Sequence, residues 1–318
     1  MTVAGQDPPP ARVTKGGPGS VVPSAEVRTY YDKPVIKAPV WTWEVPWYVF
    51  FGGLSGASAV LAAVADAGGQ RQLAKVARRI GLGALLPSPV LLIADLGRPE
   101  RFHHMLRVFK PTSPMSMGSW TLVAFSAAHG GATVLAELGW LPRLRGVAQV
   151  AAAALGSVMS TYTGVLFADT AVPVWHEARG ELPFVFGAGS AASAGSTALI
   201  VAPDDHGAAR RLALGAALTE LAVVELMIRR LGELGEPYER DDARRFAKTA
   251  KGLLVTGAAL VSLGRRWRPV QVVGAALIVG GAACERWAVY RAGFISARDP
   301  KYTVGPQRAR ADGHSAGS

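Results

Sequence analysis

The segment between residues 95 and 120 holds the polar residues with the clearest chemical potential in this sequence. It reads Asp95-Leu96-Gly97-Arg98-Pro99-Glu100-Arg101-Phe102 and then Ser113-Pro114-Met115-Ser116-Met117-Gly118-Ser119-Trp120. Pro99 disfavours a helical conformation at Arg98, which predicts that a helix ends there. Asp95 would then lie in the last turn, where the helix dipole disfavours a carboxylate, so we expect an ion pair with Arg98. Such a pair either exchanges protons with a ligand or only locks the loop.

Two carboxylates and one histidine fall inside apolar stretches. An ionised side chain at membrane depth is costly and usually marks a pathway or a pair. Glu225 lies four residues before Arg229, which predicts a salt bridge near a helix end. Glu220 has no such neighbour, and we predict that it belongs to a proton path. His129 is a second candidate for that path, or else a hydrogen-bonded packing residue.

The composition predicts an all-α, polytopic membrane protein. Half of the 318 residues are hydrophobic, only 18% are charged, and the mean hydropathy is positive. A spanning helix needs about 20 mostly apolar residues, and such residues come in blocks here. We predict about eight transmembrane helices, with six or seven as alternatives, at about 46–65, 76–94, 120–138, 147–168, 182–202, 212–228, 250–263 and 270–287. Residues 1–40 are expected to form a disordered polar tail and residues 291–318 a polar C-terminal tail, flanking a transmembrane domain over 41–290.

Prolines, serines and charged residues predict local features of these helices. Pro87 and Pro89 interrupt the second stretch, and Ser116 or Ser119 is expected to cap the third helix. The last two stretches are short and flanked by arginine, so they form a tight hairpin or one of them lies at the interface. Glu285 and Arg286, near the end of the last stretch, are expected to snorkel to the membrane surface.

Charge and cysteine content exclude several kinds of partner and site. The net charge of +11 comes from lysines and arginines that lie between apolar blocks, as loop charge does in membrane proteins, so we expect no nucleic acid partner. Most of them fall on the side that would hold both termini, which predicts cytoplasmic termini. A lone cysteine, Cys284, excludes a disulfide framework and an iron–sulfur cluster held by this chain alone.

The 95–102 and 113–120 segments together resemble the signature of the NrfD/PsrC family, the membrane subunits of polysulfide-reductase-like and related molybdoenzyme complexes. Two other segments agree with this resemblance, which covers about residues 41–290. One is Trp43-Glu44 with Pro46 and Tyr48, leading into Gly52-Gly53-Leu54-Ser55-Gly56. The other is Tyr162-Thr163-Gly164, followed by Pro173 and Trp175.

The resemblance implies two four-helix bundles in the plasma membrane of a prokaryote, without haem. It implies a quinone, either menaquinone or ubiquinone, bound near one membrane face beside a ferredoxin-like iron–sulfur subunit. That subunit exchanges electrons with a molybdopterin catalytic subunit. The family's quinone pocket corresponds here to Glu44, Trp47 and Tyr162, although relatives often carry asparagine and histidine at the first two positions. Quinone reduction takes two electrons and two protons. Tyr162 could hydrogen-bond a quinone oxygen, and Glu44 or Asp95 could exchange protons with the quinone.

Three other functions remain open at this stage. A cytochrome b-type anchor needs axial histidines on facing helices, whereas only His129 is well inside a predicted span. A secondary solute transporter would explain the break at Pro87 and Pro89, but the other half of the chain shows no matching break. A purely structural anchor would lack quinone binding. We expect the electron-transfer subunit, with no redox centre of its own.

Overall fold

The computed structural model describes residues 34–202, 207–264 and 267–305, and within these ranges it contains helices and no strands. Seven described helices are long and apolar enough to cross a membrane, with α2 and α3 counted as one span. They are α1 (Glu44–Ala67), α2 (Arg71–Leu85) with α3 (Pro87–Ala94), α4 (Pro114–Leu138), α5 (Pro142–Ala168), α7 (Leu182–Val201), α9 (Asp241–Leu263) and α10 (Arg268–Arg298). The prediction of an all-α, polytopic membrane protein is confirmed.

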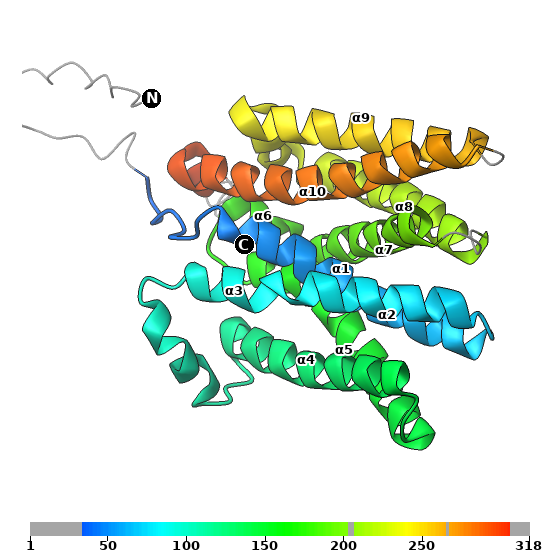
Figure 1. The fold of residues 1–318 in the computed structure, drawn as a ribbon. Helices are drawn as coiled ribbons and strands as arrows, with labels where there is room; N and C mark the ends of the chain where they lie inside the picture. The colour runs from blue at the N-terminus through cyan, green and yellow to red at the C-terminus, as the bar shows by residue number, and fades with distance from the viewer. Residues whose placement is uncertain (1–33, 203–206, 265–266, 306–318) are drawn as a thin grey trace, which may run out of the picture.

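The remaining long helix, α8 (Gly207–Leu231), has 25 residues and contains the sixth predicted stretch. It runs alongside α7 with the other long helices (Figure 1). It is not one of the seven apolar candidate spans, because it carries several charged residues. These include Glu220 in its middle and Arg229 and Arg230 in its last turn. Seven helices therefore qualify as spans by length and composition, and α8 is the candidate for the predicted eighth span.

The long helices pack in two groups of four (Figure 1). In the first group, α1 contacts α2 and α5, and α4 contacts α5 and α2. In the second, α7 contacts α8 and α10, and α9 contacts α10 and α8. Helices α1 and α5 also pack against α7 and so join the groups. This arrangement agrees with the two four-helix bundles that the family resemblance implies.

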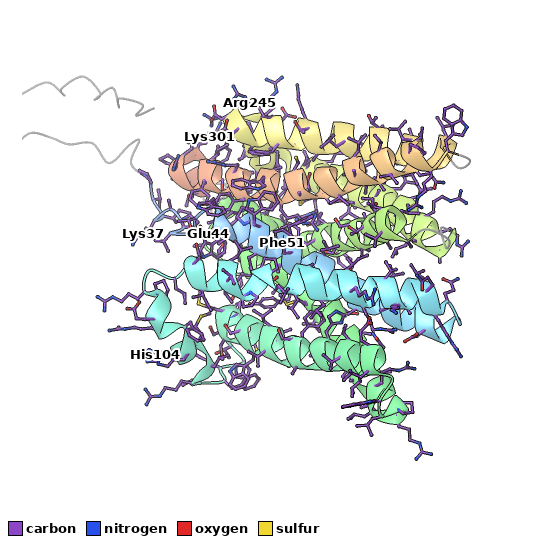
Figure 2. All side chains as sticks on the ribbon, viewed as in Figure 1. Lys37, Glu44, Phe51, His104, Arg245 and Lys301 are labelled. Carbon is purple, nitrogen blue, oxygen red and sulfur yellow. The ribbon has the colours of Figure 1, made fainter. Side chains whose placement is uncertain are left out.

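Most of the connecting structure lies at one end of the helices, which we call the loop-rich end (Figure 1). It holds the start of α1, the end of α10 and the short helices η1 (Pro99–Leu106), α6 (Pro173–Glu177), η2 (Ala178–Gly180) and η3 (Gly232–Glu239). Figure 2 shows Glu44, His104, Arg245 and Lys301 at this end, with Phe51 deeper among the helices. The functional site described below lies here.

Helix α4 begins six residues before the predicted start of 120. Its N-cap is Ser113, whose hydroxyl accepts a hydrogen bond from the Ser116 N–H at 3.5 Å, and Pro114 occupies the first turn. The prediction that Ser116 or Ser119 caps this helix was wrong, because proline suits the first helical position and the cap therefore precedes Pro114. The Ser116 hydroxyl instead donates to the Val108 carbonyl oxygen at 3.0 Å and holds the preceding loop.

The last two long helices exceed their predicted lengths. Helix α9 has 23 residues and α10 has 31, and the two pack closely as consecutive helices that both qualify as spans. Because α10 continues to Arg298, the first eight residues of the predicted polar tail are helical. In this extension Gly293 packs against the Trp175 indole so closely that a Cβ atom would overlap it. The predicted tails at 1–33 and 306–318 lie outside the described residues.

Helices α1 and α5 cross at a pair of glycines. A Cβ atom on Gly156 would lie 2.5 Å from the Gly56 carbonyl oxygen, so Gly156→Ala must push the helices apart. We expect the variant to lose about 1–3 kcal/mol of stability, as overpacked cores do. Thermal unfolding of the purified protein measures this loss. The matched control is Gly131→Ala in α4, where the added Cβ meets open space and alanine favours the helix; equal stability of the two variants would contradict the prediction.

Candidate functional site

A pocket opens at the loop-rich end between α1, α3, η1, α4 and α5. The empty space within it is about 430 Å³, a volume that includes the open solvent at its mouth. Most of its wall is apolar or aromatic, with a few polar groups. The lining residues are Trp41, Val45, Tyr48, Leu92, Asp95, Met105, Met115, Gly118, Ser119, Tyr162 and Leu166.

Tyr162 reaches from α5 across the pocket to α4. Its hydroxyl donates a hydrogen bond to the Pro114 carbonyl oxygen at the start of α4. The ring lies so close to Gly118 that a Cβ atom there would come within 2.5 Å of the hydroxyl oxygen. The glycine of the 118–120 motif is therefore the residue that lets the Tyr162 side chain span the two helices.

Asp95 follows directly after α3 and lines the same pocket. Its Oδ1 accepts two hydrogen bonds from Thr42, one from the backbone N–H at 3.0 Å and one from the hydroxyl at 2.8 Å. The expected ion pair with Arg98 does not form between these two described residues. Arg98 has an extended backbone just before η1 and its side chain is exposed, so Thr42 takes the place of the arginine.

Two carboxyl groups meet at the Thr42 hydroxyl. Its oxygen contacts Glu44 Oε2 as well as Asp95 Oδ1, but a hydroxyl has one proton and can donate to only one of them. Burial raises the pKa of Asp95 above its ordinary value; the Thr42 hydrogen bonds lower it less, and the Glu44 charge raises it further. Within this Glu44–Thr42–Asp95 group at the pocket wall, Asp95 therefore keeps a proton to a higher pH than an ordinary aspartate does.

Tyr48, which is not among the predicted site residues, presents a second polar group. It is buried on α1 and lines the pocket, and its hydroxyl makes no hydrogen bond with any part of the chain that the structure describes. Trp41 forms the neighbouring wall, where its indole stacks on Trp175 with 5.4 Å between ring centroids. The Tyr290 hydroxyl donates to the Trp41 carbonyl oxygen at 2.8 Å and fixes that segment. The only sequence signal for Tyr48 was its place beside Pro46 in the family motif.

A comparison with protein-family models matches the description "Polysulphide reductase, NrfD" over residues 33–231, which is more than half of the chain. The chain belongs to the NrfD family. It is thus a multi-pass membrane protein of a family of membrane subunits of respiratory oxidoreductase complexes. Among curated proteins, no match was found. The matched region contains every residue that lines the pocket and ends with α8.

Of the three quinone-binding residues predicted from the NrfD resemblance, only Tyr162 lines the pocket. Glu44 does not line the pocket but lies beside it, where it contacts the Thr42 hydroxyl that is bonded to Asp95. Trp47 lies elsewhere, because one residue along a helix rotates a side chain by about 100° away from the Tyr48 face. Its ring packs against Phe50 at 6.1 Å and against Trp287 of α10 at 6.3 Å between centroids.

The two residues predicted for a proton path also lie outside the pocket of this NrfD-family protein. Glu220 does have a partner, Arg286, whose Nη1 lies 2.8 Å from its Oε1. Glu285 and Arg286 are both buried, so the prediction that they snorkel to the surface was wrong. Glu225, by contrast, forms the predicted surface salt bridge with Arg229 at 2.9 Å.

His129 is a buried residue of α4 in the first group of helices. Its Nε2 lies 3.2 Å from the Arg78 carbonyl oxygen, and its ring stacks on Phe125 at 5.4 Å between centroids. A carbonyl oxygen can only accept, so Nε2 carries a proton and donates. The buried Nδ1 has no partner within the described ranges. The structure thus places His129 in a hydrogen-bonded packing position, and its part in a proton path stays a prediction.

Proposed function

We propose that this NrfD-family protein binds a quinone in the pocket at the loop-rich end and connects the membrane quinone pool with an oxidoreductase partner. The observation that carries the proposal is an apolar pocket whose wall holds an uncommitted hydroxyl, from Tyr48, and a carboxyl, from Asp95. A quinone ring is flat and apolar, and its two carbonyl oxygens need hydrogen-bond donors. Pockets of this kind, apolar with a few placed polar groups, suit such a ligand.

The lining residues fit the ligand in distinct ways. The Tyr48 hydroxyl can donate to one carbonyl oxygen, and Asp95, whose Oδ1 is occupied by Thr42, can use Oδ2 towards the pocket. Tyr162 holds the α4 and α5 walls together through Pro114, and Trp41 gives an aromatic face. When bound, the quinone supplies two-electron, two-proton redox chemistry. The Glu44–Thr42–Asp95 group is placed to exchange a proton at the pocket wall.

The break in the second span, which also suggested a transporter, has a role in this site. Helix α2 ends at Leu85 and α3 begins at Pro87. The separate α3 segment then brings Leu92 and Asp95 to the pocket. This supports a function at the membrane face rather than a transport site between two broken helices.

The proposed partners are a ferredoxin-like iron–sulfur subunit and a molybdopterin catalytic subunit. Family membership supports partner subunits in general. The exposed η1 region beside the pocket, with its basic and histidine side chains, gives a polar surface on which a soluble subunit could dock: Arg98, Arg101, His103, His104, Arg107 and Lys110. The excess of lysine and arginine on the side holding both termini supports a cytoplasmic loop-rich end in a prokaryotic plasma membrane.

Binding of a short-chain quinone to the purified protein tests the proposal. Quenching of tryptophan fluorescence should report saturable binding, because Trp41 lines the pocket. Tyr48→Phe removes one donor and should raise Kd about five- to ten-fold, since a hydrogen bond contributes about 1 kcal/mol. Tyr302→Phe makes the same change at a buried tyrosine outside the pocket lining and should bind as the unmodified protein does.

The possible outcomes distinguish whether the protein binds a quinone at all from whether Tyr48 takes part in binding it. Absence of saturable quinone binding to the unmodified protein would overturn the proposed function. Saturable binding with the same Kd in Tyr48→Phe would leave the pocket function standing and remove Tyr48 from it.

A further inference from the structure

A second buried polar cluster lies in the other group of helices, apart from the pocket. Glu220 in the middle of α8 is fully buried, and Arg286 and Glu285 of α10 are 1% and 3% exposed. Tyr238 of η3 is also buried, and its hydroxyl feels the charge of Glu285. We call Glu220, Tyr238, Glu285 and Arg286 the α8–α10 cluster.

Arg286 is directed towards Glu220 and α7. Its Nη1 donates to Glu220 Oε1 at 2.8 Å, and its Nη2 donates to the Phe186 carbonyl oxygen at 2.7 Å and to Ser190 Oγ at 3.4 Å. Gly189 makes room for this pair, because a Cβ atom there would lie 2.2 Å from both Arg286 Nη1 and Glu220 Oε1. The Arg286 guanidinium therefore neutralises the Glu220 carboxylate, and none of its hydrogen bonds reaches Glu285.

The cluster has two carboxyl groups and one cation. Helix α7 has no titratable side chain, and the charged residues of α9 are at exposed positions. On α6, His176 is exposed and Glu177 lies near Arg230, and on α1 the ionisable groups belong to the pocket or to the Asp66–Arg78 pair. The neighbours whose charges act on Glu285 are Glu220 and Arg286. With both carboxyls ionised, the cluster would carry an uncompensated negative charge at membrane depth, which is costly.

Unpaired polar atoms concentrate in the same place. Within the described ranges, eight buried side-chain atoms lack a hydrogen-bond partner, and four of them belong to the cluster: Glu220 Oε2, Tyr238 Oη, Glu285 Oε1 and Arg286 Nε. Buried polar groups are almost always paired with protein or with internal water. Donors and acceptors gathered in one polar cluster are the partners that internal water needs.

We propose that the α8–α10 cluster is a hydrated proton-binding site in which Glu285 holds one proton at neutral pH, while Glu220 stays ionised against Arg286. The bound proton sits on a Glu285 carboxyl oxygen and comes from water, to which it returns when the site is emptied. This site goes beyond the proposed quinone function and does not depend on it. It also gives Glu220 a different place from the one predicted, as the counter-ion rather than the proton carrier.

Infrared difference spectroscopy of the full-length protein tests the proposal. A protonated carboxylic acid has a carbonyl stretch well separated from that of a carboxylate, and the stretch shifts in D₂O. At neutral pH we expect one such band from this cluster, shifting promptly on transfer to D₂O because water reaches it. Glu285→Gln, which keeps size and hydrogen-bonding shape, should abolish that band and leave the thermal unfolding curve cooperative.

Glu225→Gln is the matched control, because Glu225 lies on the same α8 helix but pairs with Arg229 and Lys251 at the surface. Its spectrum should retain the band. Asp95 can contribute a separate carboxylic-acid band, so the assignment depends on the part of the signal that Glu285→Gln removes. A spectrum that Glu285→Gln leaves unchanged would overturn the assignment, and so would an equal loss in Glu225→Gln. If the band fails to shift in D₂O over hours, the hydrated site is overturned.

Discussion

Replacement of Arg286 by methionine is expected to lower the free energy of unfolding by about 3–5 kcal/mol, because it leaves the fully buried Glu220 carboxylate without its cation. Methionine keeps much of the side-chain length, so the loss reflects charge and hydrogen bonding more than packing. The Phe186 carbonyl oxygen and the Ser190 hydroxyl oxygen each lose the hydrogen bond that Arg286 donates, while Phe186 keeps the one from Ser190. Unfolding of the purified protein in mixed micelles, followed by circular dichroism, measures the change.

A double variant separates the lone-charge penalty from the net stabilisation by the pair. Replacing a buried ion pair with apolar residues of similar size is often close to neutral, so Glu220→Leu combined with Arg286→Met should recover most of the stability. Arg229→Met is the control, since Arg229 is exposed and its salt bridge with Glu225 should contribute less than about 1 kcal/mol. A double variant as unstable as Arg286→Met alone would show that packing around α10, and not an unpaired charge, dominates.

Local sequence patterns predicted those parts of the site that depend on neighbouring residues. Pro87 and Pro89 placed the break before α3, and the family motif identified Asp95 and Tyr162. The helix end predicted at Arg98 from Pro99 was wrong, because α3 ends at Ala94 and Pro99 instead begins η1. The choice between Trp47 and Tyr48 failed because adjacent residues on a helix face different directions, and the phase of α1 is set by its packing against α5 and α10. Only the structure shows that Tyr48 faces the pocket.

Pairs between distant segments could not be predicted from one sequence. Thr42 bonds Asp95 from 53 positions away, and Arg286 bonds Glu220 from 66 positions away. The i to i+3 and i to i+4 rules supplied Arg98 for Asp95 and no partner for Glu220, so the first expectation failed while Glu225–Arg229 succeeded. Arg286 was expected at the surface because α10 was predicted to end at about 287, whereas it continues to Arg298 and keeps Arg286 buried.

Asp95→Asn is expected to remove the pH dependence of quinone binding and to lower quinone turnover about 10²- to 10⁴-fold. A quinone carbonyl oxygen needs a donor, which Asp95 provides only when protonated. Because burial raises its pKa above that of an ordinary aspartate, binding to the unmodified protein should weaken as the pH rises through this raised value. The asparagine amide donates at every pH and its oxygen still accepts the Thr42 hydrogen bonds, but it cannot release a proton.

Two measurements divide these effects. Fluorescence titrations with a short-chain quinone across the pH range give Kd, and quinol-dependent reduction of an artificial acceptor by the native complex, purified through a tag on this chain, gives turnover. Asp299→Asn is the control, because Asp299 lies at the same end and pairs with Arg240 outside the pocket lining. Retained binding with lost turnover in Asp95→Asn assigns the proton transfer to Asp95. Full turnover in this variant would contradict that role, since binding alone needs only the hydrogen bond that the amide still makes.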